Sequence, residues 1–159
     1  MLSFETPNYS SSDARAKSRK RPYHVLFADI TYLHTERGHM YLFLVTDQFS
    51  RSIVGWQLSS SLTNEGAVTA LRKALERAPL HGVIIHHSDR GVQYCCHDFV
   101  DFARENGVTV SMTDEDHCAQ NAIAERVNGI LKSEFFLDET FSSYSEAHRA
   151  FTRAVRTRR

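Results

Sequence analysis

The chain has 159 residues, which is enough for one domain with a hydrophobic core and too few for two comfortable ones. With 42% hydrophobic and 24% charged residues it is composed like an ordinary globular protein, without a bilayer-spanning apolar run or a secretory signal pattern, so we expect a cytosolic protein. Its formal net charge is zero, which excludes the strongly basic overall balance typical of proteins that bind polyanions.

The N-terminal part of the chain divides into an arm and three strands. Residues 1–22 are Ser-rich, basic and without apolar periodicity, so we expect a flexible arm followed by one domain over residues 23–159. Three apolar, β-branched stretches with short connections then predict an antiparallel meander. We expect these strands over residues 24–34, 40–46 and 51–58.

Helices and strands alternate in the rest of the chain. Apolar positions Val68, Leu71, Ala74 and Leu75 fall on one face of the first predicted helix. In chain order we expect a helix capped by Thr63, a strand over 82–86, a helix around 99–103 that stops at Asn106-Gly107, a strand over 108–112, a helix over 119–136, and a last helix that begins at Ser143 with Glu146 at capping-box spacing. This order predicts a five-stranded mixed α/β sheet with helices on both faces, the order of a ribonuclease H-like fold.

Three acidic residues stand where a purely structural role is hard to justify. Asp29 lies in the middle of the first strand, where a carboxylate costs desolvation energy unless it has a partner or a metal. Asp89 follows the fourth strand, at the end where α/β sheets bind ligands, and Glu125 lies in the long helix among small and apolar residues. Singly they also fit a paired interior carboxylate, a turn residue before Gly91 and a surface residue. Together they supply the oxygen ligands that Mg²⁺ or Mn²⁺ takes.

The three carboxylates belong to three sequence blocks, and 35 residues separate Asp89 from Glu125. The blocks are Asp29-Ile30-Thr31-Tyr32, His87-Ser88-Asp89-Arg90-Gly91-Val92-Gln93-Tyr94 and Asn121-Ala122-Ile123-Ala124-Glu125-Arg126-Val127-Asn128-Gly129-Ile130-Leu131-Lys132. In this order and at this spacing they resemble the D,D(35)E catalytic cores of bacterial insertion-sequence transposases and retroviral integrases, from about Tyr23 to the end. Many relatives have Asp-Asn-Ala where this chain has Gln120-Asn121-Ala122. We expect this departure to alter either the residues that support the carboxylates or the DNA contact, without abolishing chemistry.

The resemblance implies a metal-dependent polynucleotidyl transferase, the catalytic domain of a DNA transposase. Asp29, Asp89 and Glu125 are then implied to hold two Mg²⁺ or Mn²⁺ ions for in-line displacement at phosphorus, first in strand cleavage and later in strand transfer. The implied partners are double-stranded DNA, at transposon ends and at the target, and further copies of the chain in at least a dimer. Such an enzyme acts on DNA in the bacterial cytoplasm.

Five more residues are candidate DNA contacts. Asn121, Asn128 and Lys132 lie at helical spacing from Glu125, and Lys132 resembles the integrase lysine that contacts the donor DNA end. The two asparagines either contact DNA or orient Glu125, and a polar stripe facing water explains the same pattern. Arg90 either binds phosphate or pairs with a structural carboxylate, and Arg126 is grouped with these candidates.

Basic residues gather at the two ends of the chain, and acidic residues lie mostly between Asp98 and Glu139. Because phosphate contacts depend on local charge, this pattern suits contacts outside a metal site, and solvated tails explain it equally well. The basic residues are Arg15, Lys17, Arg19, Lys20 and Arg21, then Arg149, Arg153, Arg156, Arg158 and Arg159. We also expect one of His86 and His87 to face the core and Asp47 to be a turn or supporting residue.

Three alternatives stay open at this point. A ribonuclease H-like nuclease shares the fold and the metals, and a transposase-derived DNA-binding module shares the fold without the chemistry. A zinc module through Cys95, Cys96, His97, His117 and Cys118 lacks the C-x-x-C spacing of structural sites, so structural cysteines in a reduced compartment are the better interpretation. Since no helix-turn-helix precedes the core, we expect a piece of a longer protein or one product of a split reading frame.

Overall fold

The computed structural model describes residues 21–112, 125–126, 129–130, 132–133 and 139–157. Most of the N-terminal arm expected over residues 1–22 lies outside this part of the chain. So does most of the helix expected over residues 119–136, although the described residues between 125 and 133 are all helical. None of the described helices is long and apolar enough to cross a membrane.

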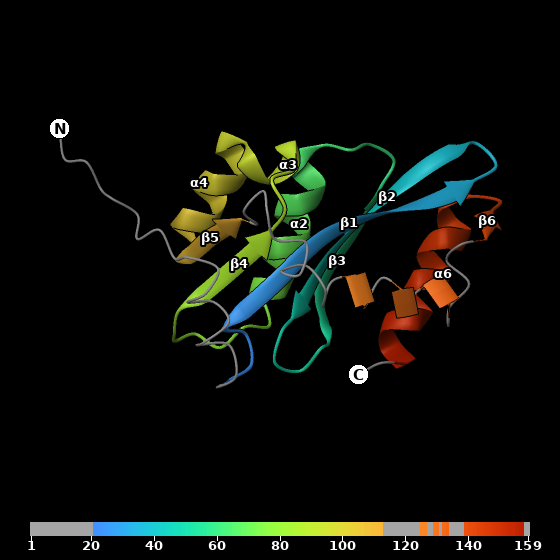
Figure 1. The fold of residues 1–159 in the computed structure, drawn as a ribbon. Helices are drawn as coiled ribbons and strands as arrows, with labels where there is room; N and C mark the ends of the chain where they lie inside the picture. Colours follow the sequence, from blue (N-terminus) through green and yellow to red (C-terminus); the bar gives the residue numbers. More distant parts are fainter. Residues whose placement is uncertain (1–20, 113–124, 127–128, 131, 134–138, 158–159) are drawn as a thin grey trace.

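The described strands form one six-stranded sheet (Figure 1). They are β1 (Val25–Thr35), β2 (Gly38–Asp47), β3 (Ile53–Ser59), β4 (Ile84–Ser88), β5 (Val108–Met112) and β6 (Thr140–Phe141). The first three strands are an antiparallel meander, and β4 and β5 extend the sheet on the other side of β1, parallel to it. The strand order is β3-β2-β1-β4-β5, and the short β6 pairs with the far end of β1.

Helices cover both faces of this sheet. They are α2 (Asn64–Leu75), α3 (Val92–Cys95), α4 (His97–Glu105) and α6 (Tyr144–Thr157). Successive strand residues point to opposite faces, so the neighbours Phe43 and Leu44 in β2 belong to different core clusters. The cluster around Phe43 packs under α2 and α4, and the cluster around Leu44 packs under α6.

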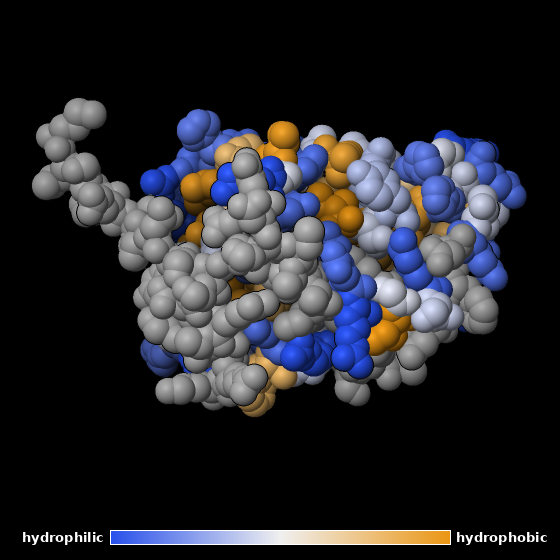
Figure 2. All heavy atoms as spheres, viewed as in Figure 1, coloured by the Kyte–Doolittle hydropathy of each residue, from blue (hydrophilic) through white to orange (hydrophobic). Residues whose placement is uncertain are grey.

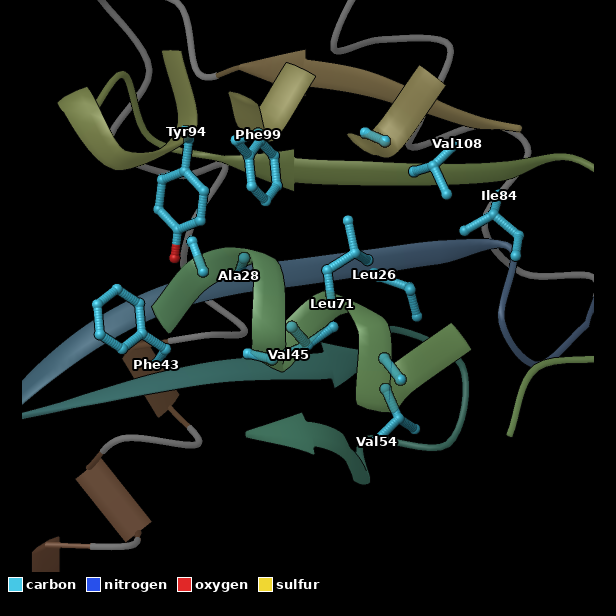
Figure 3. Packing of buried hydrophobic residues seen from close by; sticks show 14 residues of the cluster. Leu26, Ala28, Phe43, Val45, Val54, Leu71, Ile84, Tyr94, Phe99 and Val108 are labelled. Atoms are coloured by element: carbon cyan, nitrogen blue, oxygen red, sulfur yellow. The ribbon is translucent and has the colours of Figure 1, made fainter. Parts of the chain in front are cut away.

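The core under α2 depends on a close approach of helix and sheet (Figure 3). Leu71 of α2 and Phe43 of β2 are both fully buried there. A Cβ atom on Gly55 would lie 2.2 Å from the Ala70 carbonyl oxygen, which is far inside van der Waals contact. Glycine at this position of β3 therefore allows α2 to pack directly on the strand backbone.

The core under α6 joins the C-terminal helix to the meander. Phe151 is fully buried, and its ring lies 4.8 Å from that of Trp56, which is half-buried against the same cluster. At the start of the helix the Glu146 amide donates to Ser143 Oγ at 3.2 Å, as a capping box requires. The Glu146 carboxylate, however, accepts hydrogen bonds from the amide and hydroxyl of Ser142. The Glu146 side chain thus binds Ser142, one residue before the Ser143 that the predicted capping box required.

The predicted element order and mixed sheet are confirmed, with several local corrections. The fourth strand runs on to Ser88 and does not stop at His86, because its last residues are buried between β1 and β5. Thr63 precedes α2 as predicted, but its side chain makes no capping hydrogen bond. Val68 and Leu75 are only half-buried, since the fully buried side of α2 is centred on alanines. The two-residue strand β6 was not predicted, because its only partner is distant in sequence.

Candidate active site

The pairing of β1 with β4 brings Asp29 and Asp89 to one place. In this parallel pair Phe27 lies opposite His87. Continuing the same register by two residues places Asp29 level with Asp89, and adjacent strands lie about 4.8 Å apart. Asp29 is half-buried within β1, whereas Asp89 is exposed directly after the end of β4. Both residues therefore lie near the carboxyl end of β4, and their role as metal ligands stays a prediction.

Tyr94 is a third group at this place. It lies in α3, only 2% exposed, and its ring packs 5.4 Å from that of Phe99. Burial raises the pKa of the Tyr94 phenol well above its usual value, and the negative charges of Asp29 and Asp89 raise it further. The phenol therefore stays protonated beside both carboxylates. Figure 3 shows its ring reaching from α3 toward β1.

Tyr94 belongs to the sequence block that contains Asp89, but no role was predicted for it. Its position just after Asp89 could have indicated a place in the site, because a buried tyrosine needs a polar neighbour for its hydroxyl. Periodicity alone does not separate such a residue from an ordinary core aromatic.

The loop after β4 fixes the orientation of Asp89. The Gly91 amide donates to Asp89 Oδ1 at 2.9 Å, and Ser88 Oγ donates to the Asp89 carbonyl oxygen at 3.0 Å. A Cβ atom on Gly91 would itself lie 2.9 Å from Asp89 Oδ1, so a larger residue would displace the carboxylate. Asp89 is thus a turn residue before Gly91, one of the interpretations made from the sequence, and its role as a metal ligand stays a prediction.

The third predicted ligand, Glu125, is exposed and helical. Among the described residues, no three or more His, Cys, Asp or Glu side chains are grouped so that they could hold a metal ion. The convergence of Glu125 with the two aspartates therefore stays a prediction. The zinc alternative gains no cluster from Cys95, Cys96 and His97, and its other members, His117 and Cys118, lie outside the described residues.

The candidate DNA contacts are only partly described. Arg90 is exposed beside Asp89, Arg126 is exposed beside Glu125, and Lys132 is half-buried in the same helical segment. Asn121 and Asn128, like Gln120, lie outside the described residues. The contact roles of all five candidates stay predictions.

Of the two histidines before Asp89, His86 faces the core, as expected of one of them, and His87 is buried as well. His86 is fully buried in the cluster under α2 and α4, 5.0 Å from the Phe99 ring, and neither of its ring nitrogens has a hydrogen-bond partner among the described residues. Burial lowers the pKa of His86 to about 3; the adjacent His87 contributes to the shift, and the backbone of His86 opposes it. His87 points to the opposite face, where its Nδ1 lies 3.1 Å from Ser111 Oγ.

Asp47 is a turn residue, as one of the two expectations had it. Its carboxylate accepts hydrogen bonds from the Tyr23 amide at 3.0 Å and from the amide and hydroxyl of Ser50 at 3.0 and 2.7 Å. The residue pairs with Leu26, nearer the start of β1 than Asp29 is. Asp47 therefore stabilises the β2–β3 turn, at a level of β1 three residues before Asp29.

Comparison with known proteins agrees with this geometry. The integrase core domain family matches residues 19–118. The chain is 35% identical over 126 residues to the insertion element IS600 uncharacterized 31 kDa protein of Shigella sonnei, and 38% identical over 115 residues to the transposase InsF for insertion sequence IS3A of Escherichia coli K12. These matches cover 79% and 72% of this chain but only 46% and 40% of the relatives, so the chain spans less than half of their length.

Solved structures show the same fold. The HTLV-2 integrase catalytic core domain in complex with magnesium, in its dimeric form, superimposes with a TM-score of 0.68 at 20% identity, over 87% of this chain and 88% of that one. The catalytic core domain of BIV integrase superimposes with a TM-score of 0.63 at 18% identity, over 84% of this chain and 81% of that one. The predicted ribonuclease H-like fold is thereby confirmed.

Proposed function

Because the chain belongs to the integrase core domain family, we propose that it is the catalytic core of a bacterial transposase that cleaves and joins DNA strands with divalent metal ions. The observation that carries this proposal is that Asp29 in β1 and Asp89 just after β4, in strands that pair in parallel up to Phe27 and His87, both act on the buried Tyr94 phenol. The relatives named as transposases support DNA as the substrate.

The residues present suit Mg²⁺ or Mn²⁺. Two carboxylates near one buried phenol supply hard oxygen ligands. Burial is the larger cause of the raised pKa of Tyr94, and the negative charges of both carboxylates, which a cation would neutralise, raise it further. We propose Asp29, Asp89 and Glu125 as the ligands of two ions. When bound, such ions activate a water or a 3′-hydroxyl and stabilise the leaving oxygen of an in-line displacement at phosphorus.

The chain's own residues then have distinct tasks. Asp29 is held rigidly in a strand that has neighbours on both sides at its start, and the Gly91 amide orients Asp89. The protonated Tyr94 adds no third negative charge to the pair. Glu125, on a helix, is the ligand that is most easily moved into or out of place.

DNA contacts and assembly complete the proposal. Arg90, Arg126 and Lys132 supply positive charge beside two of the three carboxylates, which suits phosphate contacts. Asn121 and Asn128 are proposed as further contacts. The working complex contains double-stranded DNA, from transposon ends and target, and at least two copies of the chain, acting in the cytoplasm at the nucleoid.

Metal binding and strand chemistry test the proposal separately. Titration calorimetry with Mn²⁺ is expected to show binding that falls at least about tenfold in Asp29→Asn and in Asp89→Asn, because each removes a charged ligand. Asp98→Asn, on an exposed carboxylate of α4, is the matched control and is expected to bind like the wild type. Equal Mn²⁺ affinity in all four proteins would remove the metal site from the proposal.

Strand chemistry is followed on a labelled duplex that carries the terminus of the element encoding the chain. With Mg²⁺ or Mn²⁺ we expect nicked and joined products that disappear in Glu125→Gln and persist in Glu105→Gln, another exposed helical glutamate. Products that persist in Glu125→Gln would exclude Glu125 as the third ligand. A wild type that binds Mn²⁺ but yields no products would show that this chain alone does not carry out the reaction.

A further inference from the structure

The β1–β2 hairpin carries two pairs of aromatic rings on one face. Tyr32 lies directly opposite Tyr41 in the strand register, and His34 lies opposite His39. The ring centroids are 5.3 Å apart in the first pair and 4.9 Å apart in the second, and both pairs meet edge to face. These four side chains are the aromatic row.

The aromatic row is accessible. Tyr32 is 49% exposed, His34 and His39 are exposed, and Tyr41 is half-buried. By strand alternation the row shares the face of Phe43, which α2 covers further along the sheet. In Figure 1 the hairpin extends beyond α2 and α3, and Figure 2 shows hydrophilic side chains over this end of the molecule. Contact between the rings across the two strands stabilises the hairpin. That structural role does not by itself require the rings to be exposed to solvent.

The row and Asp29 lie on opposite faces of the same strand. Tyr32 follows Asp29 by three residues, and strand alternation turns the two side chains to different faces. Among the described strands, β4 pairs only with residues 25–27 of β1 and β6 only with residues 34–35, so no described strand pairs with residues 28–33 on that side. A DNA strand held at the carboxylates would reach the row only by crossing this stretch of β1.

The chemistry of the row suits bases more than phosphates. Aromatic rings bind nucleic acid by stacking on bases, in a way that tolerates any sequence. The hairpin tip holds one positive and one negative side chain, Arg37 and Glu36, so it offers little net charge to a phosphate backbone. Successive pairs lie about 7 Å apart along the strands, roughly twice the rise per nucleotide of stacked DNA, which suits bases drawn away from their neighbours.

We propose that the aromatic row binds unpaired DNA bases beyond the edge of β1 that separates it from the carboxylates. This inference rests on the proposed function for the choice of DNA, and it adds a contact surface that the carboxylate chemistry does not require. The partner is thus a single strand, or the frayed end of a duplex, held by stacking on tyrosine and imidazole rings.

Binding of a fluorescein-labelled oligothymidylate, followed by anisotropy in EDTA, tests the proposal without any strand chemistry. The triple variant Tyr32→Thr/His34→Thr/His39→Thr removes three rings and keeps β-branched residues that suit strands. We expect its affinity to fall about tenfold or more, since each stacked base contributes on the order of a tenfold factor. Phe49→Thr, at an equally exposed ring in the β2–β3 turn, is the matched control and is expected to bind within twofold of the wild type.

Two further readouts separate stacking from loss of structure and from phosphate contact. Tyr32→Phe keeps the ring and is expected to retain wild-type affinity. The slope of log affinity against log salt is expected to be the same in the triple variant and the wild type, because no phosphate contact is removed. Photocrosslinking to iodouracil-substituted oligonucleotide is expected to label the peptide that contains Tyr32.

Several outcomes overturn the proposal. The wild-type protein does not bind the oligonucleotide, or the affinity of the triple variant is within twofold of the wild-type value. The proposal also fails if Phe49→Thr loses as much affinity as the triple variant, or if crosslinks are confined to peptides without Tyr32. The proposed function fails by a different result, the absence of Mn²⁺ binding or of strand products. Because the oligonucleotide assay runs in EDTA and needs no strand chemistry, it tests the aromatic row whether or not the chain is catalytically active.

Discussion

Replacing His86 by leucine is expected to stabilise the protein. The imidazole is fully buried between the Tyr94 and Phe99 rings, and neither ring nitrogen has a partner among the described residues. An unsatisfied buried polar group costs about 1–3 kcal/mol, and a hydrophobic replacement of similar volume costs less than about 1.5 kcal/mol in packing. At pH 7 we therefore expect His86→Leu to raise the free energy of unfolding by about 1 kcal/mol.

The gain should grow as the pH falls. Burial lowers the pKa of His86 to about 3, whereas an unfolded histidine has a pKa of about 6.5. Between these values the unfolded chain binds one more proton than the folded one, so the wild type loses up to about 1.4 kcal/mol of stability per pH unit of acidification. From pH 7 to pH 5 this loss is about 2 kcal/mol, and the leucine variant does not suffer it.

Urea unfolding at pH 7 and pH 5 measures both effects. Trp56 is the only tryptophan in the chain and packs against Phe151, so its fluorescence reports loss of the core under α6. His81→Leu, in an exposed loop, is the control and should differ little from the wild type at either pH. If His86→Leu is less stable than the wild type, or its advantage is the same at both pH values, the imidazole has a partner and the reasoning is refuted.

Three further substitutions test the fold and the site. Gly55→Ala should lower the free energy of urea unfolding by about 3 kcal/mol, because its Cβ would overlap the Ala70 carbonyl, and a loss below about 1 kcal/mol would contradict the close helix–strand contact. Gly91→Ala should leave stability within about 1 kcal/mol, since its φ of −57° suits alanine, but should weaken Mn²⁺ binding several-fold by displacing Asp89. Unchanged Mn²⁺ affinity in calorimetry would show that this carboxylate is not constrained by the turn. Asp47→Ala should cost about 3 kcal/mol in the same unfolding assay, because it leaves two main-chain amides without their acceptor, and a neutral result would show that water replaces it.

The order of helices and strands could be predicted from the sequence, because it is indicated by local patterns, the hydrophobic periodicity and the turn residues. The end of the fourth strand could not, since His87 and Ser88 are polar residues that normally mark the start of a loop. They are buried because β4 lies between β1 and β5, and the His87 ring lies beside Ser111 Oγ of the next strand. Such burial depends on strand order, which local patterns do not specify.

The candidate site shows the same division. The sequence places Asp29 in a strand and Asp89 just after another, and those two positions could be predicted from polarity and spacing. That they lie level depends on the β1–β4 register, and the role of Tyr94 depends on how α3 returns over β1. The aromatic row likewise follows from a register, because Tyr32 and Tyr41 become neighbours only when the hairpin turns at residues 36–37.

Asp29 and Asp89 bring two negative charges near one buried phenol. Burial is the larger cause of the raised pKa of Tyr94, and both aspartates raise it further. A protein selected for stability alone would gain from an apolar or amide residue at one of the two positions, because nearby like charges disfavour each other. Keeping both charges is expected where a bound cation offsets them, which is why we propose a metal site here and not a structural carboxylate pair.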